Sequence, residues 1–300
     1  MKMTTDKPVA VKYTGSWKDY SGYGEANRNF IYALHVAGVD MTTDAVSFVK
    51  ERSDYGIAHA LAEKLEHRPL EYDIKIIHLT PDQYMTHLEP LKYHIGHLFW
   101  ETDRIPPYWV WTCNRLDEIW TGTEGTKSAL IKSGVRVPIW VFPEPILEPT
   151  GTFEPYIIPN HSGFMFYAIF ECTKRKNPEA LLNAYWKEFE GNDKVSLLLK
   201  TFRDDFSYQN HQKIKEKIKG LKELSGIKIF PRVLYNSELL TQEEIFRLHA
   251  TGDCLVSTHR GEGWGRPQVE AMIMGKPVIS TNAGGIHEYL NDTVAYLTQF

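Results

Sequence analysis

Short apolar runs alternate with longer amphipathic stretches along most of the chain. An apolar run of about four to eight residues predicts a buried strand, and apolar residues spaced three or four apart predict a helix. Alternating strands and helices are typical of an α/β unit with a parallel sheet. In the first half the pattern predicts strands at 9–14, 41–49, 73–79, 94–99, 118–123 and 138–142, and helices at 25–36, 56–65, 107–113 and 124–133.

A proline-rich segment separates this first half from a second one. Five prolines fall within residues 143–159, and we interpret this segment as a linker. We therefore expect two Rossmann-like, doubly wound α/β domains, residues 1–147 and 148–300, with a ligand in the cleft between them. The strands predicted for the second half are 163–170, 195–201, 227–233, 253–257 and 278–281, and its helices are 178–189, 211–224, 242–249 and one that starts at Pro267.

Composition narrows the class of protein without identifying it. Hydrophobic residues make up 42% of the chain and charged residues 24%, as in globular proteins. The net charge of −4 gives no overall basic field that would indicate a nucleic-acid partner, although a local basic patch stays open. The widely spaced Cys113, Cys172 and Cys254 fit neither a metal site nor a secreted disulfide framework, so we expect a reducing, cytoplasmic compartment. The first eight residues are polar, unlike a signal peptide, and no apolar run is long enough to span a membrane.

The most informative segment is the glycine-rich loop that follows the strand predicted at 253–257. Gly261, Gly263 and Gly265 allow a sharp turn and a close approach of the backbone to a ligand. Pro267 suits the first position of a helix. The early N–H groups of such a helix have no partner inside it, and together with the helix dipole they form an anion site.

Two glutamates flank the start of that helix. Glu262 lies in the loop, and Glu270 is expected in the first helical turn. A carboxylate only accepts hydrogen bonds, so it prefers hydroxyl donors such as those of a ribose or hexose. Loop and carboxylates together predict a site for a phosphorylated sugar. On spacing alone, an ordinary strand–loop–helix connection in which Glu270 complements the helix dipole is an equally good interpretation.

A second loop with phosphate-binding character follows the strand predicted at 163–170. Its Arg175 and Lys176 are suited to clamp a diphosphate and to neutralise charge that grows on a leaving group. A solvated basic loop is the alternative interpretation. Lys200 ends the next predicted strand, at the same edge of the sheet, and is a weaker candidate for a phosphate or sugar contact.

The segment from residue 262 onwards resembles the Glu-x7-Glu motif of retaining GT-B glycosyltransferases of the family 4 type, the glycosyl transferases group 1. The resemblance implies a GT-B fold in which residues 1–147 form the acceptor domain and residues 148–300 the nucleotide-sugar donor domain. It also implies transfer of a hexosyl or pentosyl group from a nucleoside-diphosphate sugar, with retention of the anomeric configuration. These enzymes place an arginine and a lysine in the basic loop, and Lys176 resembles the lysine. Glu171 stands where the arginine is expected, so Arg175 would supply the second cation. The matching positions are Glu262-Gly263-Trp264-Gly265, Pro267, Glu270-Ala271-Met272, Gly275-Lys276-Pro277-Val278-Ile279, Gly284-Gly285 and Glu288.

The resemblance also implies roles for single residues. Glu270 would accept hydrogen bonds from the ribose hydroxyls, and Glu262, as a catalytic residue, from the transferred sugar. The chain contains no Asp-x-Asp triplet, so this design requires no metal ion, and we expect no cofactor besides the donor substrate. The departing diphosphate would be stabilised by loop amides and two catalytic cations, namely Gly263, Trp264, Gly265, Arg175 and Lys176.

Two loops of the first half are weaker candidates. Gly22-Tyr23-Gly24 resembles a loop of GT-B enzymes whose glycines approach the donor phosphates or the acceptor, with Gly22 and Gly24 as the candidates for donor binding. A tight strand–helix turn explains it as well, and Asn27 stands where a dinucleotide fingerprint requires glycine. Glu101 and Asp103 lie in a Phe/Trp-Glu-Thr-Asp-Arg-Ile-Pro stretch similar to one in a subset of family 4 enzymes. They would orient the acceptor hydroxyl or fix the domain hinge.

Other conspicuous residues have structural explanations. His97 lies inside a predicted strand, and we interpret it as packed there. The lysine-rich helix 211–224 is interpreted as a solvated face, which leaves peripheral contact with an anionic membrane open. GT-B enzymes usually continue past the last strand with helices that return to the first domain, and we expect this chain to lack them.

Two further classes of function stay open at this point. One is a non-catalytic GT-B-like subunit that binds a nucleotide or glycan, and the other is a GT-B-fold nucleotide-sugar epimerase or an NAD-type Rossmann enzyme. The sequence names neither the nucleobase and sugar of the donor nor the oligomeric state. It also leaves the acceptor open among a glycan, a lipid, a protein and a modified nucleobase, because acceptor residues lie in loops.

Overall fold

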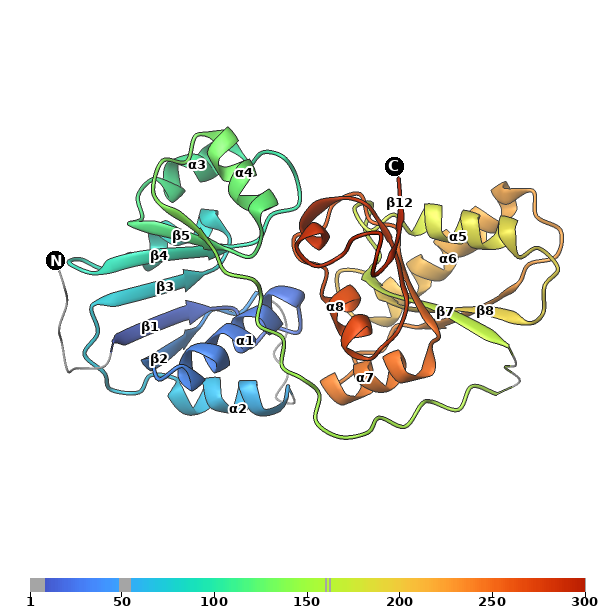
Figure 1. Cartoon of the computed structure of the whole chain (residues 1–300), viewed down its shortest axis with the longest axis horizontal. Helices are drawn as coiled ribbons and strands as arrows, with labels where there is room; N and C mark the ends of the chain where they lie inside the picture. The colour runs from blue at the N-terminus through green and yellow to red at the C-terminus, as the bar shows by residue number, and fades with distance from the viewer. Residues whose placement is uncertain (1–8, 49–54, 160, 162, 300) are drawn as a thin grey trace. The chain divides into compact units, whose positions relative to one another are not determined.

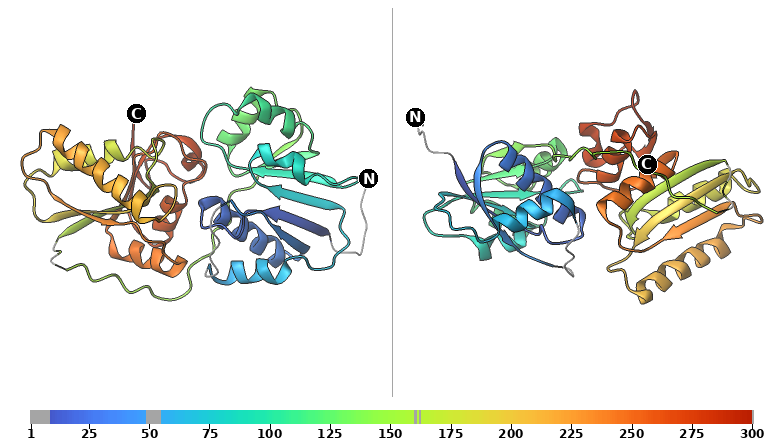
Figure 2. Two further views of the ribbon diagram at one scale, coloured as in Figure 1. Left: turned by 180° about the vertical axis from the view of Figure 1, so that it is seen from behind. Right: turned by 90° about the horizontal axis from the view of Figure 1, so that it is seen from below.

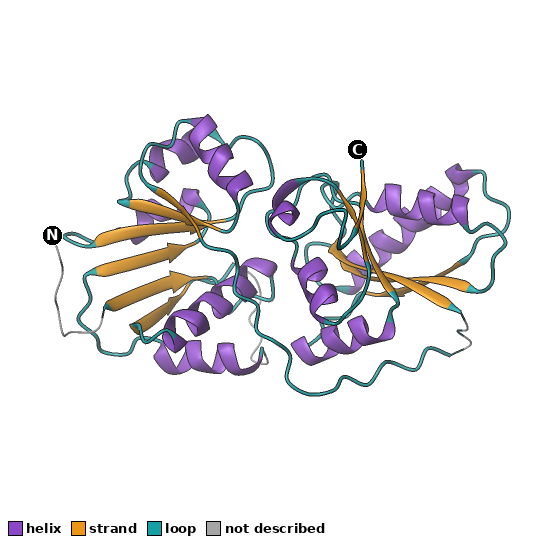
Figure 3. Cartoon of the chain, in the orientation of Figure 1, coloured by secondary structure: helices purple, strands orange, loops and turns teal. Residues whose placement is uncertain are grey.

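The computed structural model describes residues 9–48, 55–159, 161 and 163–299 (Figure 1). Contacts between residues divide the chain into two units, Met1–Leu147 and Glu148–Phe300. Each unit contains one six-stranded sheet whose paired strands are all parallel, with helices between the strands (Figure 3). The predicted α/β class with two parallel sheets is thereby confirmed. How the two units face each other, and their roles as acceptor and donor domains, stay predictions.

Unit 1 has the sheet order β2-β1-β3-β4-β5-β6. Because β2 and β3 lie on opposite sides of β1, the direction of winding changes beside the first strand, as in other doubly wound sheets. The elements of unit 1 are β1 (Ala10–Gly15), α1 (Gly22–Val36), β2 (Asp40–Ala45), α2 (Gly56–Leu65), β3 (Ile74–His78), η1 (Pro81–His87), β4 (Tyr93–Leu98), α3 (Pro107–Cys113), β5 (Glu118–Thr121), α4 (Glu124–Ser133) and β6 (Ile139–Val141).

Helices cover both faces of this sheet (Figure 2). Alternate strand residues point to opposite faces, so Ile76 and Ile77 of β3 belong to different cores. Ile76 packs with residues of α1 and α2, such as Phe30. Ile77 packs with residues of α3 and α4, such as Trp109. This two-sided burial explains why the strands read as continuous apolar runs.

Unit 2 has the sheet order β12-β11-β10-β7-β8-β9. Its α5 and α6 pack on one face with residues of β7 and β8, and α7 and α8 pack on the other face. The elements of unit 2 are β7 (Phe164–Glu171), α5 (Pro178–Glu188), β8 (Val195–Phe202), α6 (Tyr208–Ser225), β9 (Arg232–Asn236), α7 (Gln242–Thr251), β10 (Cys254–Ser257), α8 (Arg266–Ile273), β11 (Val278–Thr281), η2 (Gly284–Glu288) and β12 (Tyr296–Thr298).

Three predicted boundaries that bear on the site are wrong. Helix α8 begins at Arg266 after the N-cap Gly265, so Glu270 lies in the second turn and not in the first. Lys200 does not end its strand, because β8 stays paired with β7 as far as Phe202. Helix α1 begins at Gly22, since the Ser21 side chain caps it, so the preceding loop is shorter than predicted.

Other differences lie at the ends of elements. The strand predicted at 227–233 is β9, Arg232–Asn236, because α6 extends to Ser225 and residues 227–231 connect the two. The short β12, η1 and η2 were not predicted. The strand predicted at 41–49 ends at Ala45, and residue 49 lies outside the described residues. Cys113, Cys172 and Cys254 are buried free thiols.

Candidate functional site

The candidate site of unit 2 lies where its sheet changes the direction of winding. β7 is the first strand of the sheet, β8 lies on one side of it and β10 on the other. The loops that follow β7 and β10 therefore leave neighbouring strands in opposite directions at the carboxyl edge. Ligands of open α/β sheets bind outside such a point. These two loops are the basic loop and the glycine-rich loop singled out in the sequence.

Hydrogen bonds fasten the two loops to each other. The backbone N–H of Arg260 donates to the carbonyl of Arg175 over 2.7 Å. The Arg260 guanidinium donates to the Asn177 side chain over 3.0 Å, and the Thr258 hydroxyl donates to the Asn177 carbonyl over 3.0 Å. Asn177 has a φ of 54°, a left-handed conformation that asparagine tolerates better than most residues. The cations of the basic loop are thus held beside the glycines.

Glu262 is paired with both predicted cations. Its carboxylate accepts a hydrogen bond from Lys176 Nζ, and its Oε1 lies 3.7 Å from Arg175 Nη1. Arg175 also donates to the carbonyl of Gly261 over 3.0 Å. Burial opposes ionisation of Glu262, but Lys176 and Arg175 outweigh it and lower the pKa of the carboxyl group. The three side chains predicted to be catalytic therefore lie together as one charged cluster.

The loop backbone offers donors to an anion. Among the residues that the structure describes, the N–H groups of Gly263, Trp264 and Gly265 have no hydrogen-bond partner. The carbonyls of Trp264 and Gly265 each accept from the Tyr289 hydroxyl over 2.8 Å, which fixes the peptide planes. Gly265 has a φ of +94°, and a Cβ there would lie 2.5 Å from the Tyr289 oxygen. The loop is thus held in a conformation that requires glycine.

Gly284 and Gly285 pack against the backbone of Glu262 in the glycine-rich loop. The Gly285 N–H donates to the carbonyl of Glu262 over 2.7 Å. A Cβ on Gly284, whose φ is +84°, would lie 2.5 Å from the same carbonyl oxygen. These two glycines of the motif therefore allow close packing against Glu262.

Glu270 is engaged by two partners on its own side of the sheet. Arg266 Nη2 donates to Oε1 over 2.8 Å, and His249 Nε2 lies 3.3 Å from Oε2. Burial opposes ionisation, but Arg266 and His249 outweigh it and lower the pKa of the carboxyl group. Only 8% of the side chain is exposed. A ligand hydroxyl would share the carboxylate with these partners.

His259, between β10 and the glycine-rich loop, is a residue of the site that the sequence pattern did not single out. It is buried, and its Nε2 lies 2.9 Å from the carbonyl oxygen of Ala283. A carbonyl only accepts, so Nε2 carries the proton and Nδ1 accepts from the Ser257 hydroxyl over 3.0 Å. Gln268 in turn donates to Ser257 over 3.1 Å. His259 therefore ties β10, α8 and the segment after β11 together.

Lys200 lies within β8 and is buried, with 5% of the residue exposed. Its Nζ lies 5.3 Å from the centre of the Phe206 ring and 5.9 Å from that of Phe202. Burial lowers the pKa of Lys200 to about 8. In the described part of the chain no carboxylate lies within ion-pair distance of it. A buried ammonium without a carboxylate is suited to an anionic ligand, but the contact stays a prediction.

The candidates of unit 1 form a separate group. Gly24 lies in the first turn of α1, where its N–H donates to Ser21 Oγ over 3.1 Å, so this amide is already used. A Cβ on Gly24 would lie 2.2 Å from the Asp19 carbonyl oxygen, whereas one on Gly22 would meet no atom within 4 Å. Gly24 thus allows close packing of the turn, and the ligand role expected for Gly22 and Gly24 stays a prediction.

Glu101 and Asp103 follow β4. The N–H of Phe99 at the end of that strand donates to the Tyr23 hydroxyl over 3.1 Å, which brings this segment beside the Gly22-Tyr23-Gly24 turn. Asp103 is exposed. Their roles toward an acceptor or a hinge stay predictions.

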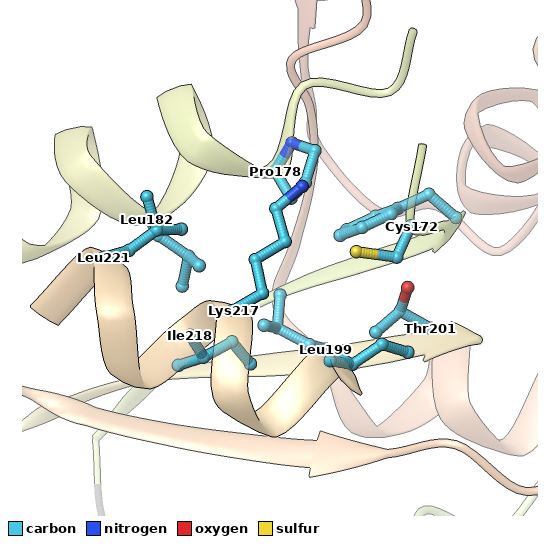
Figure 4. A pocket seen from close by; sticks show the side chains of 10 residues that line it. Cys172, Pro178, Leu182, Leu199, Thr201, Lys217, Ile218 and Leu221 are labelled. Carbon is cyan, nitrogen blue, oxygen red and sulfur yellow. The ribbon is translucent and has the colours of Figure 1, made fainter. Parts of the chain in front are cut away.

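A small pocket with room for about one water molecule lies elsewhere in unit 2 (Figure 4). Cys172 and Thr201 line it from the sheet, and Pro178 and Lys217 line it from α5 and α6. None of the predicted site residues lines it.

In the described ranges no group of His, Cys, Asp and Glu side chains is arranged to hold a metal ion. Nor is any helix there both long and apolar enough to cross a membrane.

A family model matches the second unit of the chain. Residues 164–299 match the family model of glycosyl transferases group 1. The matched range covers unit 2 from β7 to β12 and so includes both loops of the candidate site. No curated protein sequence matches the chain.

Solved structures match the fold of both units. HepE from Anabaena in complex with UDP-glucose has 16% identity and a TM-score of 0.64, over 97% of this chain and 85% of HepE. Sucrose-phosphate synthase from Thermosynechococcus elongatus has 15% identity and a TM-score of 0.64, and the match covers 97% of this chain and 86% of the synthase. A UDP-forming trehalose-phosphate synthase from Burkholderia xenovorans has 12% identity and a TM-score of 0.64, and the match covers 98% of this chain and 88% of that synthase. The chain therefore has the fold of these GT-B glycosyltransferase structures.

Proposed function

We propose that the protein is a glycosyltransferase that takes its sugar from a nucleoside-diphosphate sugar bound at the carboxyl edge of the second sheet. The observation that carries the proposal is the cluster beside β7 and β10. There, three successive backbone N–H groups without partners among the described residues lie next to the Lys176–Glu262–Arg175 ion pairs. Such an arrangement supplies donors and positive charge for a pyrophosphate, with a carboxylate beside it.

In this proposal the diphosphate takes over the cations that now pair with Glu262. Lys176 and Arg175 would turn to the phosphate oxygens and neutralise the charge that develops when the glycosidic bond to the nucleotide breaks. Glu262, released from them, would accept hydrogen bonds from hydroxyls of the transferred sugar. Glu270 would accept from the ribose hydroxyls.

The comparisons support a uridine nucleotide as the first donor to test. The HepE structure holds UDP-glucose, and the trehalose-phosphate synthase is described as UDP-forming. We further propose that the anomeric configuration is retained, as the Glu-x7-Glu resemblance implies, and that the reaction needs no added metal ion. The acceptor, and whether the sugar is a hexose or a pentose, are left to experiment.

Turnover assays test the proposal. The protein is incubated with UDP-glucose, UDP-galactose, UDP-N-acetylglucosamine, and GDP- and ADP-linked sugars, each with a panel of glycan, lipid and protein acceptors, while release of nucleoside diphosphate is measured. The proposal predicts acceptor-dependent release that falls at least about tenfold in Glu262→Gln, since a hydrogen bond to a charged group contributes about 1.5–3 kcal/mol. Donor consumption without any acceptor, or acceptor-independent change of the sugar, would favour an epimerase. Binding without turnover would favour a non-catalytic subunit.

A further inference from the structure

A buried chain of three side chains leads from the second sheet to Glu270. The Tyr167 hydroxyl of β7 lies 2.9 Å from His249 Nδ1. His249, on α7, places its Nε2 3.3 Å from Glu270 Oε2 on α8. Tyr167 and His249 are both completely buried. Neither residue belongs to the Glu-x7-Glu motif, and neither lies in the two loops of the site.

The chemistry at the two ends of this chain fixes where the protons are. Glu270 is ionised, so its oxygens only accept, and His249 must therefore carry a proton on Nε2. Burial raises the pKa of Tyr167, so the phenol keeps its proton and can donate it to Nδ1. Nδ1 faces the phenol and Nε2 faces the carboxylate, so both ring nitrogens of His249 are held. Tyr167 thereby orients the imidazole ring toward Glu270, as a hydrogen bond to the second nitrogen orients histidines in other sites.

Arg266 holds the other oxygen of the same carboxylate. It donates to Oε1 over 2.8 Å from one helical turn earlier, while His249 donates to Oε2. Two donors on two oxygens fix the plane of the carboxylate. Each oxygen keeps a second acceptor position, because an ionised carboxylate offers about four in total. Two vicinal hydroxyls can occupy the two remaining positions.

We infer that His249, with Tyr167 behind it, is a positioning residue that holds Glu270 ready to accept both hydroxyls of a nucleotide ribose. The inference rests on the proposed function, because it assumes a nucleoside diphosphate in this site. His249 touches no ligand itself. It acts through Glu270, so its loss should affect recognition of the ribose hydroxyls and leave phosphate binding intact.

The experiment compares each nucleoside diphosphate with its 2′,3′-dideoxy analogue. UDP, GDP, ADP and CDP are titrated with their analogues by calorimetry into the full chain and into His249→Phe, His249→Gln and Tyr167→Phe. For wild type we expect one diphosphate to bind at least about tenfold more tightly than its analogue, since hydrogen bonds to a charged group are involved. In H249F the ratio of the two affinities, diphosphate over dideoxy analogue, should fall to about one. The affinity for the analogue itself should stay at the wild-type level.

The conservative variants serve as controls. Glutamine at position 249 keeps a distal N–H donor, so H249Q should recover most of the ratio. Y167F removes only the hydroxyl that orients the His249 ring, so it should lower the ratio by about threefold, as expected for the loss of one hydrogen bond. If H249F does not fold, Y167F still tests the inference, because an unchanged ratio in Y167F would contradict it.

The outcomes separate the inference from the proposed function. If folded wild type binds none of the diphosphates, the proposed function fails, and the inference fails with it. If wild type binds a diphosphate but all variants keep its ratio to the analogue, or if H249F weakens both ligands equally, only the inference is overturned. Equal weakening would mean that His249 merely supports the fold of unit 2.

Discussion

Unit 1 should lose stability in mild acid because it buries two neutral histidines against each other. The rings of His78 and His97 stack with centroids 3.9 Å apart and an interplanar angle of 22°. Both residues are completely buried, and neither ring nitrogen of His97 has a partner among the described residues. Burial lowers the pKa of His97 from 6.5 to about 3. The perturbation to test is His97→Phe, which keeps an aromatic ring and removes the titratable group.

The sign of the effect follows from proton uptake. In the unfolded chain His97 gains a proton as the pH falls through 6.5, whereas in the folded protein it stays neutral down to about 3. The contribution of neutral His97 to the free energy of unfolding is therefore fully present above pH 6.5. It falls as the pH is lowered from 6.5 to about 3, and below pH 3 it does not change further. At pH 5 the loss from His97 is about 2 kcal/mol, an order-of-magnitude figure from 1.36 kcal/mol per pH unit. His78, whose pKa is also lowered by burial and by His97, adds to this.

The free energy of unfolding is measured by hydrogen exchange at pH 5 and pH 7, followed by mass spectrometry of peptides from β4. Between pH 7 and pH 5 the free energy of unfolding of wild type should fall by about 2 kcal/mol more than that of H97F. At pH 7 the variant should be at least as stable as wild type, because the substitution removes the two buried ring nitrogens of His97 that have no partner among the described residues. His35 is exposed, so His35→Phe is the matched control and should leave the loss unchanged. An equal loss in wild type and H97F would refute the reasoning.

Three further predictions concern unit 2. Gly265→Ala should abolish nucleotide binding in calorimetry, because φ is +94° and the new Cβ would lie 2.5 Å from the Tyr289 oxygen. The control is Gly220→Ala, whose new Cβ on α6 meets no atom within 4 Å and which should bind the nucleotide as wild type does. Equal affinities of the two variants would contradict the account. The affinity for a nucleoside diphosphate should fall as the pH rises through about 8, where Lys200 loses its charge. Lys200→Met should bind the diphosphate more weakly at pH 7, and its affinity should not fall in this pH range. If the affinity of K200M falls with pH as that of wild type does, Lys200 does not belong to the site. Treatment with EDTA should leave turnover within about twofold of the untreated enzyme, because the proposed diphosphate site uses Lys176, Arg175 and backbone amides; restoration of a lost activity by Mg²⁺ or Mn²⁺ would show that a metal ion is required.

The fold and the two loops of the site could be predicted because their signals are local. Buried strands of parallel sheets read as apolar runs. The glycines and the two glutamates of the motif lie within one short segment, so their spacing alone suggested the loop and helix. Element ends were less predictable where a cap decides them. Ser21 starts α1 three residues earlier than the apolar pattern does, and Gly265 starts α8 so that Glu270 falls in the second turn.

The partners of these residues could not be predicted, since they come from distant parts of the chain. Lys176 and Glu262 are 86 positions apart, and Tyr167 and His249 are 82 apart. Tyr289, which fixes the glycine loop, looks in the sequence like any aromatic residue of a core. Only the packing of the strands and helices brings such pairs together, and one sequence carries no record of it.

A crystal structure with the nucleoside diphosphate that binds most tightly tests the central claim most directly. The account predicts pyrophosphate oxygens within hydrogen-bonding distance of the backbone nitrogens of Gly263–Gly265, and Lys176 Nζ moved from Glu262 onto a phosphate. A diphosphate bound elsewhere, with Lys176 still on Glu262 and the loop amides turned away from it, would contradict the account.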